Sequence, residues 1–210
     1  MKKLILSTAL VVGLGFSQIR AQEVSGGIKL DANMSNFILS DMPGTKSKMG
    51  VGLSIGGFAK MEFSENFGLQ PELLLHWKNS KMETNSISAF GGDMDLQYFG
   101  LELPVYAVGY MNAGGGKCFL GAGPYLGFGI DARYKASGID DIDLYKEYGG
   151  QKSGMQRWDF GGGAMLGYEI ANKFQIAATY KIGFINALNA GKDDATMLNQ
   201  AISIGCGYRF

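Results

Sequence analysis

Hydrophobic and polar residues alternate along most of the chain beyond its N-terminal apolar run, and this period of two is typical of β-strands with two unlike faces. Turn-forming residues divide the alternation into segments of strand length. The pattern predicts eight strands, over residues 24–36, 49–63, 67–79, 96–110, 117–134, 157–170, 174–185 and 199–210.

The connections between these predicted strands alternate in length. The links over 64–66, 111–116 and 171–173 are short, whereas those near 37–48, 80–95, 135–156 and 186–198 are longer and more polar. If the N-terminus lies in the periplasm, every short link is periplasmic and every long link is outside. This asymmetry is expected of an outer-membrane barrel, and a soluble meander has no reason to produce it.

The two faces of the predicted strands differ in composition. One face is uncharged, as in the strand over 67–79 with Phe67, Leu69, Pro71, Leu73, Leu75 and Trp77. The other face combines glycine with charged residues, namely Lys29, Asp31, Lys60, Glu62, Glu72, Glu102, Asp131, Arg133, Arg157, Asp159, Glu169, Lys181 and Arg209. A soluble, lipocalin-like barrel would cover its outside with long polar side chains, and the second face has too much glycine for that.

We therefore predict an all-β fold, an eight-stranded antiparallel up-and-down transmembrane β-barrel. Its uncharged face would contact lipid. Its glycines would make room in a narrow lumen, where opposite charges would pair.

The last predicted strand ends in an aromatic residue, Phe210, with apolar residues at alternate positions before it. We expect this strand to pair with the strand over 24–36 and so close the barrel. Its ending resembles the signal by which outer-membrane barrels are recognised for assembly. The barrel assembly machinery is therefore an expected partner, as are outer-membrane lipid and lipopolysaccharide.

The N-terminus has the pattern of a secretory signal peptide: Lys2 and Lys3, an apolar run over 4–16, then small and polar residues up to Ala21. We expect a signal peptide over 1–21 and a barrel domain over 22–210. Removing 1–21 takes away three of the 19 basic residues and none of the 19 acidic ones, so the remainder has a net charge of −3. No basic footprint for nucleic acid remains.

Only two cysteines are present, Cys118 and Cys206, and they fall on predicted strands that are not neighbours. We expect free thiols buried at the lipid-facing surface rather than a disulfide.

Two parts of the chain carry a family resemblance. The first is YFGLELPV over 98–105, followed by FLGAGPYLG over 119–127. The second is WDFGGG over 158–163 and LGYE over 166–169, followed by YKIGF over 180–184. With the terminal strand, these segments resemble the PorT-like outer-membrane β-barrels of Bacteroidetes-type bacteria. The resemblance implies the barrel fold and provides no catalytic residues.

Candidate chemistry is sparse. His76 is the only histidine, on the inward face near the outer rim, with Ser54, Ser80 and Glu72 nearest in register. No spacing fixes a nucleophile to a base, so we favour a histidine within the charge network over a catalytic one. We predict no enzyme activity and no catalytic, metal or cofactor site.

The third long link carries an acidic cluster and several aromatic residues. Asp140, Asp141, Asp143 and Glu147 lack the spacing and glycine turn of a calcium loop, so a solvated loop is expected. The aromatic residues of this region are Tyr134, Tyr145, Tyr148 and Trp158. We expect them in the interfacial girdle, with a binding surface as the alternative.

These features favour a structural, anchoring or interaction protein with a charge-filled lumen and no general pore. A protein partner would contact the outer loops or the periplasmic turns. Two alternatives are a rim-located enzyme that modifies lipid or lipopolysaccharide, and a narrow channel or small-solute binder with a water path past Glu102 and Arg133.

Overall fold

The computed structural model describes residues 23–84, 94–136, 139–147, 153–189 and 195–210. Its strands are β1 (Glu23–Ser40), β2 (Thr45–Ser64), β3 (Phe67–Thr84), β4 (Met94–Ala113), β5 (Gly116–Ala136), β6 (Ile139–Asp143), β7 (Trp158–Ile170), β8 (Phe174–Gly183) and β9 (Thr196–Arg209). Among the described residues, no helix is long and apolar enough to cross a membrane.

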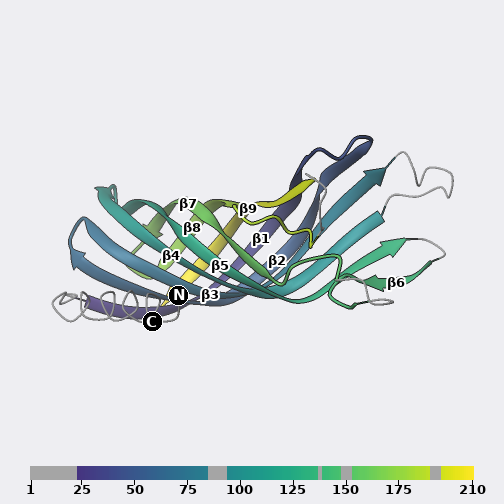
Figure 1. The fold of residues 1–210 in the computed structure, drawn as a ribbon. Coiled ribbons are helices and arrows are strands. Elements are labelled where there is room, and N and C mark those ends of the chain that lie inside the picture. The colour runs from purple at the N-terminus through teal and green to yellow at the C-terminus, as the bar shows by residue number, and fades with distance from the viewer. Residues whose placement is uncertain (1–22, 85–93, 137–138, 148–152, 190–194) are drawn as a thin grey trace, which may run out of the picture.

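Eight of these strands form a closed antiparallel barrel (Figure 1). The hydrogen-bonded order is β4-β3-β2-β1-β9-β8-β7-β5, and pairing of β4 with β5 closes the circle. The predicted closing pair is confirmed, because β9 pairs with β1 from Gly27 opposite Arg209 to Ser40 opposite Thr196. The predicted signal peptide over 1–21 lies outside the described residues.

The three connections predicted to be short lie at one end of the barrel, together with the start of β1 and the end of β9. In the β7–β8 turn, Ala171 and Asn172 both have positive φ, the backbone that a tight hairpin turn requires. Arg209 fastens the last strand to this turn, since its Nε donates to the Asn172 carbonyl at 2.6 Å. We call this end periplasmic and the opposite end outer.

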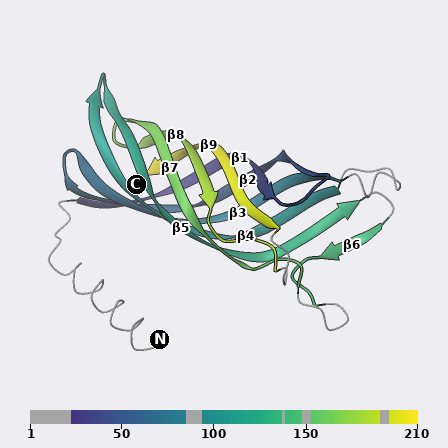
Figure 2. The ribbon, with the colours of Figure 1, turned by 45° about the horizontal axis from the view of Figure 1, so that its top comes forward.

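At the outer end, several strands run further than the sequence predicts. Residues 37–40 and 45–48, predicted as a long link, are strand, and only residues 41–44 connect β1 with β2. Another predicted link, 135–156, contains the short strand β6, which pairs with β5. In contrast, β7 and β8 stop well below the ends of β1 and β5 (Figures 1 and 2).

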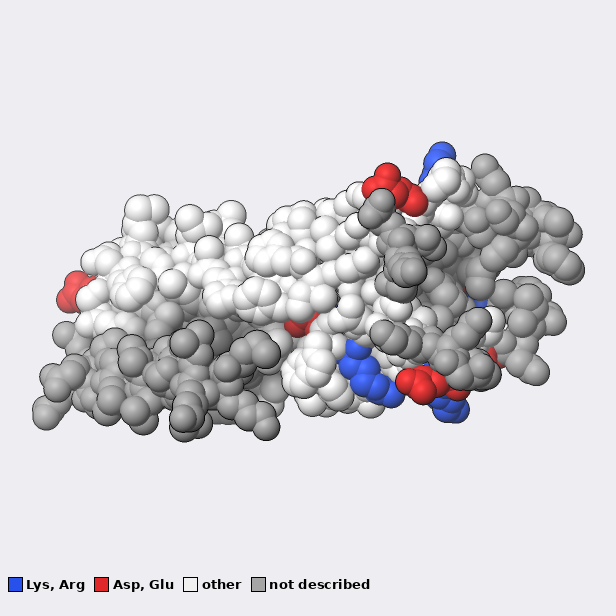
Figure 3. Space-filling view, in the orientation of Figure 1, with Lys and Arg blue, Asp and Glu red and all other residues white. Residues whose placement is uncertain are grey.

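The barrel has an uncharged outer wall with an aromatic girdle at each end. Phe67, Phe174 and Phe210 mark the periplasmic girdle, and Trp77 and Trp158 the outer one; all five are exposed. The eleven residues from Phe67 to Trp77 span about 25 Å at the usual strand tilt, the height of a lipid-facing band. Over this band the surface in Figure 3 is almost free of charge, and charged residues gather at the outer end.

The two cysteines are free, as predicted. Cys206 is exposed on the lipid-facing wall and Cys118 is half-buried on the same wall.

Candidate functional site

The lumen is filled from the periplasmic end by ion pairs that cross it. Lys60 of β2 is fully buried and binds Glu169 of β7 at 2.9 Å, although three strands separate β2 from β7 in the wall. Glu62 accepts from Lys60 at 3.3 Å and from Arg209 at 3.3 Å. These four residues form the periplasmic cluster, and the Lys60 ammonium also lies 4.3 Å from the centre of the Tyr110 ring.

Two further groups of charges lie above the periplasmic cluster. In the central cluster, Lys29 binds Glu72 at 3.0 Å and Asp31 at 3.6 Å. In the outer cluster, the fully buried Glu102 accepts from Lys78 at 2.9 Å and from Lys181. The expected pairing of lumen charges is therefore observed. Lys78 is one of these charges, although it is not among the lumen residues predicted above.

Large rings share the lumen with the charges. The inward faces carry the buried side chains Phe58, Tyr106, Tyr110, Phe119 and Tyr125. Inward glycines accommodate them: a methyl group at Gly167 would overlap the Phe119 ring, and one at Gly27 would overlap the Phe58 ring. The glycines make room in the lumen, as the sequence predicted, but largely for rings that were not anticipated.

Three charged residues predicted for the lumen lie elsewhere. Between β4 and β5 the register shifts, so that Gly100 faces Gly129 but Phe99 faces Asp131. The extra residue turns Asp131 and Arg133 to the outside, where they pair at 3.0 Å with side chains 40% and 49% exposed. Arg157 is also exposed and donates to the carbonyls of Gly129 and Ile130.

An apolar cluster covers the outer end of the lumen. We call it the outer cap; its buried members are Phe37, Met82, Leu96, Ala132, Leu144, Tyr145, Met155 and Met197. Residues 153–157 and 184–189 continue the wall above the short β7 and β8, with Gln156 donating to the Ala187 carbonyl at 2.8 Å and Ala187 to that of Met197 at 2.8 Å.

The outer cap contains two of the aromatic residues predicted for the girdle. Tyr145 is buried, which raises the pKa of its phenol, and the Arg157 guanidinium lies 4.3 Å from its ring centre. Tyr134 packs against the same cluster. Only Trp158 lies in the girdle, and Tyr148 is outside the described residues. The alternation of polar and apolar residues does not predict the outer cap, because its loop members follow no period.

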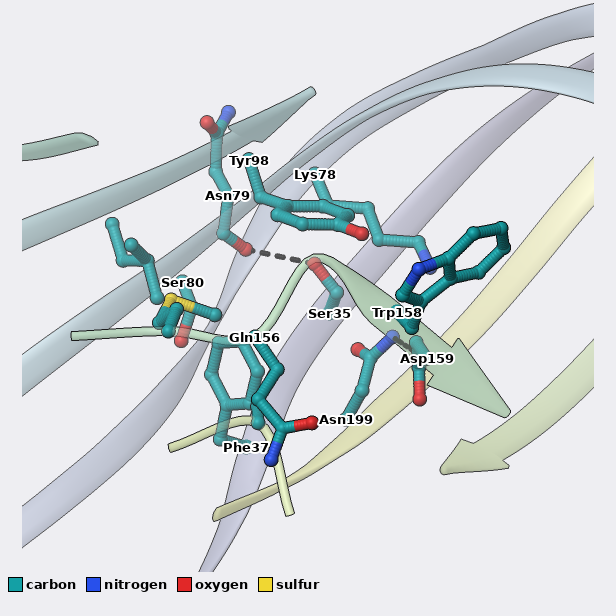
Figure 4. Close-up of a pocket in the computed structure, with 13 residues that line it drawn as sticks. Ser35, Phe37, Lys78, Asn79, Ser80, Tyr98, Gln156, Trp158, Asp159 and Asn199 are labelled. Atoms are coloured by element: carbon teal, nitrogen blue, oxygen red, sulfur yellow. Dashed lines mark hydrogen bonds between the residues drawn. The ribbon is translucent and has the colours of Figure 1, made fainter. Parts of the chain in front are cut away.

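Beneath the outer cap lies a small cavity (Figure 4). Lys78 and Tyr98 line it from one wall, and Asn199 and Asp159 from the other. Asp159 accepts from Asn199 at 2.9 Å and from Tyr125 at 3.0 Å, and Ser35 donates to the Asn79 carbonyl at 2.9 Å. The cavity has about 30 Å³ of free volume, room for about one water molecule and far less than a ligand pocket.

His76 is buried inside the lumen, not at the rim. It is 2% exposed, stacks on Tyr98 with ring centres 5.1 Å apart, and lies 3.9 Å from Glu102. Ser54 is its cross-strand neighbour, but the Ser54 hydroxyl accepts from Asn33, and neither ring nitrogen of His76 has a hydrogen-bond partner among the described residues.

The other candidate catalytic residues are engaged elsewhere. Ser80 pairs with Ser47 at 2.9 Å, and Glu72 belongs to the central cluster. The described residues thus assemble no pairing of a serine with His76.

The acidic residues of the third link are dispersed. Asp143 accepts from the Tyr145 backbone amide at 2.9 Å, and Asp141 is exposed near Lys135 at 3.9 Å. Glu147 is exposed, and Asp140 belongs to β6. The described part of the chain holds no group of three side chains suited to a metal ion.

Comparison with known proteins gives one family. Residues 16–189 match the family model described as outer membrane protein beta-barrel domain. No curated protein matches the chain.

Several solved structures are similar to this chain at low identity. One is Ail, the attachment invasion locus protein of Yersinia pestis, in complex with the heparin analogue sucrose octasulfate; identity is 16% over 90% of this chain and 100% of Ail, with a TM-score of 0.49. Neisserial surface protein A is 16% identical over 90% and 100% of the two chains, with a TM-score of 0.47. OprG from Pseudomonas aeruginosa is 16% identical over 89% and 94%, with a TM-score of 0.45.

The cross-lumen pair of Lys60 and Glu169 provides a test of the charge network. Lys60→Met leaves Glu169 buried without its cation, so we expect a loss of about 3–5 kcal/mol in the free energy of unfolding. Lys60→Met combined with Glu169→Met removes both charges and should recover most of that loss. Urea unfolding of the purified barrel, followed by its heat-modifiable gel mobility, measures both. A double variant less stable than the single one would contradict the pairing.

Proposed function

Because the chain belongs to the outer membrane protein β-barrel domain family, we propose that it anchors an interaction surface in the outer membrane, where this family resides, and forms no general pore. The observation that carries this proposal is the filled lumen. Three clusters of paired charges and several large rings occupy it, and the outer cap lies above them. Eight strands enclose a space that side chains alone can fill.

Neither alternative function has a supporting observation. A channel past Glu102 and Arg133 would need both side chains to line an open lumen. Glu102 is instead bound by two lysines, and Arg133 lies outside the barrel. A rim enzyme with His76 as its base would need this imidazole at the rim and hydrogen-bonded to a serine. The imidazole is instead buried beside Glu102 and bonded to no serine among the described residues.

We place the interaction surface at the outer end. Strands β1 to β5 extend beyond the outer girdle, and β2 to β5 carry exposed charged residues there, whereas the periplasmic end has short turns. A protein partner would contact these extensions or the periplasmic turns, and outer-leaflet lipid would surround the girdle.

Within the family, we propose a PorT-like member of the kind found in Bacteroidetes-type bacteria. The support is the pair of segments over 98–127 and 158–184, which supply wall residues of β4, β5, β7 and β8. Alignment of PorT-like barrels through both segments without gaps tests this placement.

Conductance tests the closed lumen. We expect purified protein in planar lipid bilayers to give no stable current above that of the bare membrane, because paired charges and rings leave no continuous water path. A porin of 16–18 strands serves as the positive control, and heat-modifiable mobility of the recovered protein confirms insertion. Large, stable current steps would overturn the proposal.

The C-terminal residue tests the expected assembly partner. Phe210→Ala should lower the amount of protein in the outer membrane, because it removes the aromatic end by which the assembly machinery would recognise the last strand. Phe184→Ala is the matched control, since both rings face lipid and are 62% and 76% exposed for Phe184 and Phe210. Equal levels of the two variants, with equal refolding in detergent, would contradict this role.

The proposed signal peptide has a direct test. Mass spectrometry of protein extracted from outer membranes should identify Gln22 as the first residue, because cleavage is expected after Ala21. An intact Met1 in the membrane-inserted protein would contradict the proposal.

A further inference from the structure

Charged side chains on the outside of the barrel gather on one side of its outer end. Above the outer girdle, the outward positions of β2 to β5 carry the charged rim, made of Lys46, Lys48, Lys81, Asp95, Asp131, Arg133 and Lys135. On the opposite side, the described outward residues of β1, β8 and β9 carry no charge, and Ile38 and Phe184 are exposed there.

A groove lies immediately below the charged rim. It has a volume of about 230 Å³ and is lined by Trp77, Gln97, Phe99 and Asp131, with Tyr98 behind them. Trp77, Phe99 and Asp131 follow one another across β3, β4 and β5 in register. The groove is therefore aromatic at the level of the girdle and polar toward the outside, which suits a molecule with an apolar and a polar part.

The basic residues above the groove differ in their acidic neighbours: Lys135 lies 3.9 Å from Asp141, whereas Lys81 makes no ion pair within the described part of the chain. In register, Lys81 and Lys135 flank Asp95, and Lys48 lies directly opposite Lys81. Like charges directly opposite each other destabilise a sheet. An anion bound beside Lys81 would supply the opposite charge that this lysine lacks among the described residues.

Arg133 adds a directed donor to this set. Its Nε binds Asp131 at 3.0 Å, and its two terminal nitrogens make no hydrogen bond within the described part of the chain. A guanidinium with free nitrogens can grip a phosphate through two parallel hydrogen bonds.

We propose that this groove binds one phosphorylated glycolipid of the outer leaflet, a lipid A molecule. Its phosphate lies among Lys81, Arg133 and Lys135, and its sugar lies against Trp77 and Gln97. Its acyl chains follow the lipid-facing wall below Trp77 and Phe99, where Leu75 and Leu101 are exposed. The ligand is a lipid and not a soluble phosphate. The aromatic part of the groove lies at the depth of the girdle, so a molecule that contacts it must itself be inserted in the membrane.

The test measures binding of defined lipids to the folded barrel. In a Trp158→Phe background, Trp77 is the only tryptophan of the chain, so quenching of its fluorescence by lipid A with brominated acyl chains reports occupancy. Each basic residue near an anionic lipid contributes a factor of about five in affinity. We expect Lys81→Gln, Arg133→Gln and Lys135→Gln together to weaken binding about a hundredfold.

Controls separate lipid recognition from charge and folding. Lys173→Gln, an exposed lysine in the periplasmic turn, should leave binding unchanged, and heat-modifiable mobility verifies that each variant folds. Dephosphorylated lipid A should bind as weakly as the triple variant does. The proposal is overturned if dephosphorylated lipid A binds as tightly as lipid A, if phosphatidylglycerol displaces lipid A mole for mole, or if the triple variant binds like the parent. These outcomes do not depend on whether the lumen conducts.

Discussion

The structure depends on one constraint, which is that a narrow lumen must be filled by side chains whose charges balance. Among the described residues, five basic side chains, Lys29, Lys60, Lys78, Lys181 and Arg209, and five acidic ones, Asp31, Glu62, Glu72, Glu102 and Glu169, are buried. Losing a partner in such a space costs several kcal/mol. Pairs such as Lys60 with Glu169 join strands that are not neighbours in the wall, so the network also specifies which strands face each other.

Filling the lumen explains the glycines as well. A side chain at Gly205 would overlap the Asp31 carboxylate, and one at Gly161 would overlap the Tyr125 ring. These large inward residues therefore require a small one on a neighbouring strand, as in a close-packed interior. The outer wall has no such requirement, because lipid adapts to its contour. The two faces thus follow different rules: shape and charge inside, and apolarity alone outside.

Alternation predicted the wall wherever the register is unbroken. In β9 it placed Ile204 outside and Arg209 inside, and both are found there. It failed after Ile130, where an extra residue in β5 reverses the faces and moves Asp131 and Arg133 outward. That bulge depends on pairing with β4, which no local pattern records. The outer cap was equally hidden, because Leu144 and Met155 come from segments without a period and meet only in the folded chain.

Charged residues contribute differently to folding stability in the lumen and on the charged rim. In the lumen, charges are buried, and the barrel cannot fold well without their partners. On the charged rim, the Asp131 and Arg133 side chains are 40% and 49% exposed, and ion pairs of that kind contribute little to stability. Side chains fill the lumen, so we propose that this protein contacts other molecules through outside surfaces whose residues are not needed for folding. The charged rim is such a surface, and its position just beyond the aromatic girdle is where a phosphorylated lipid headgroup would meet it in our proposal.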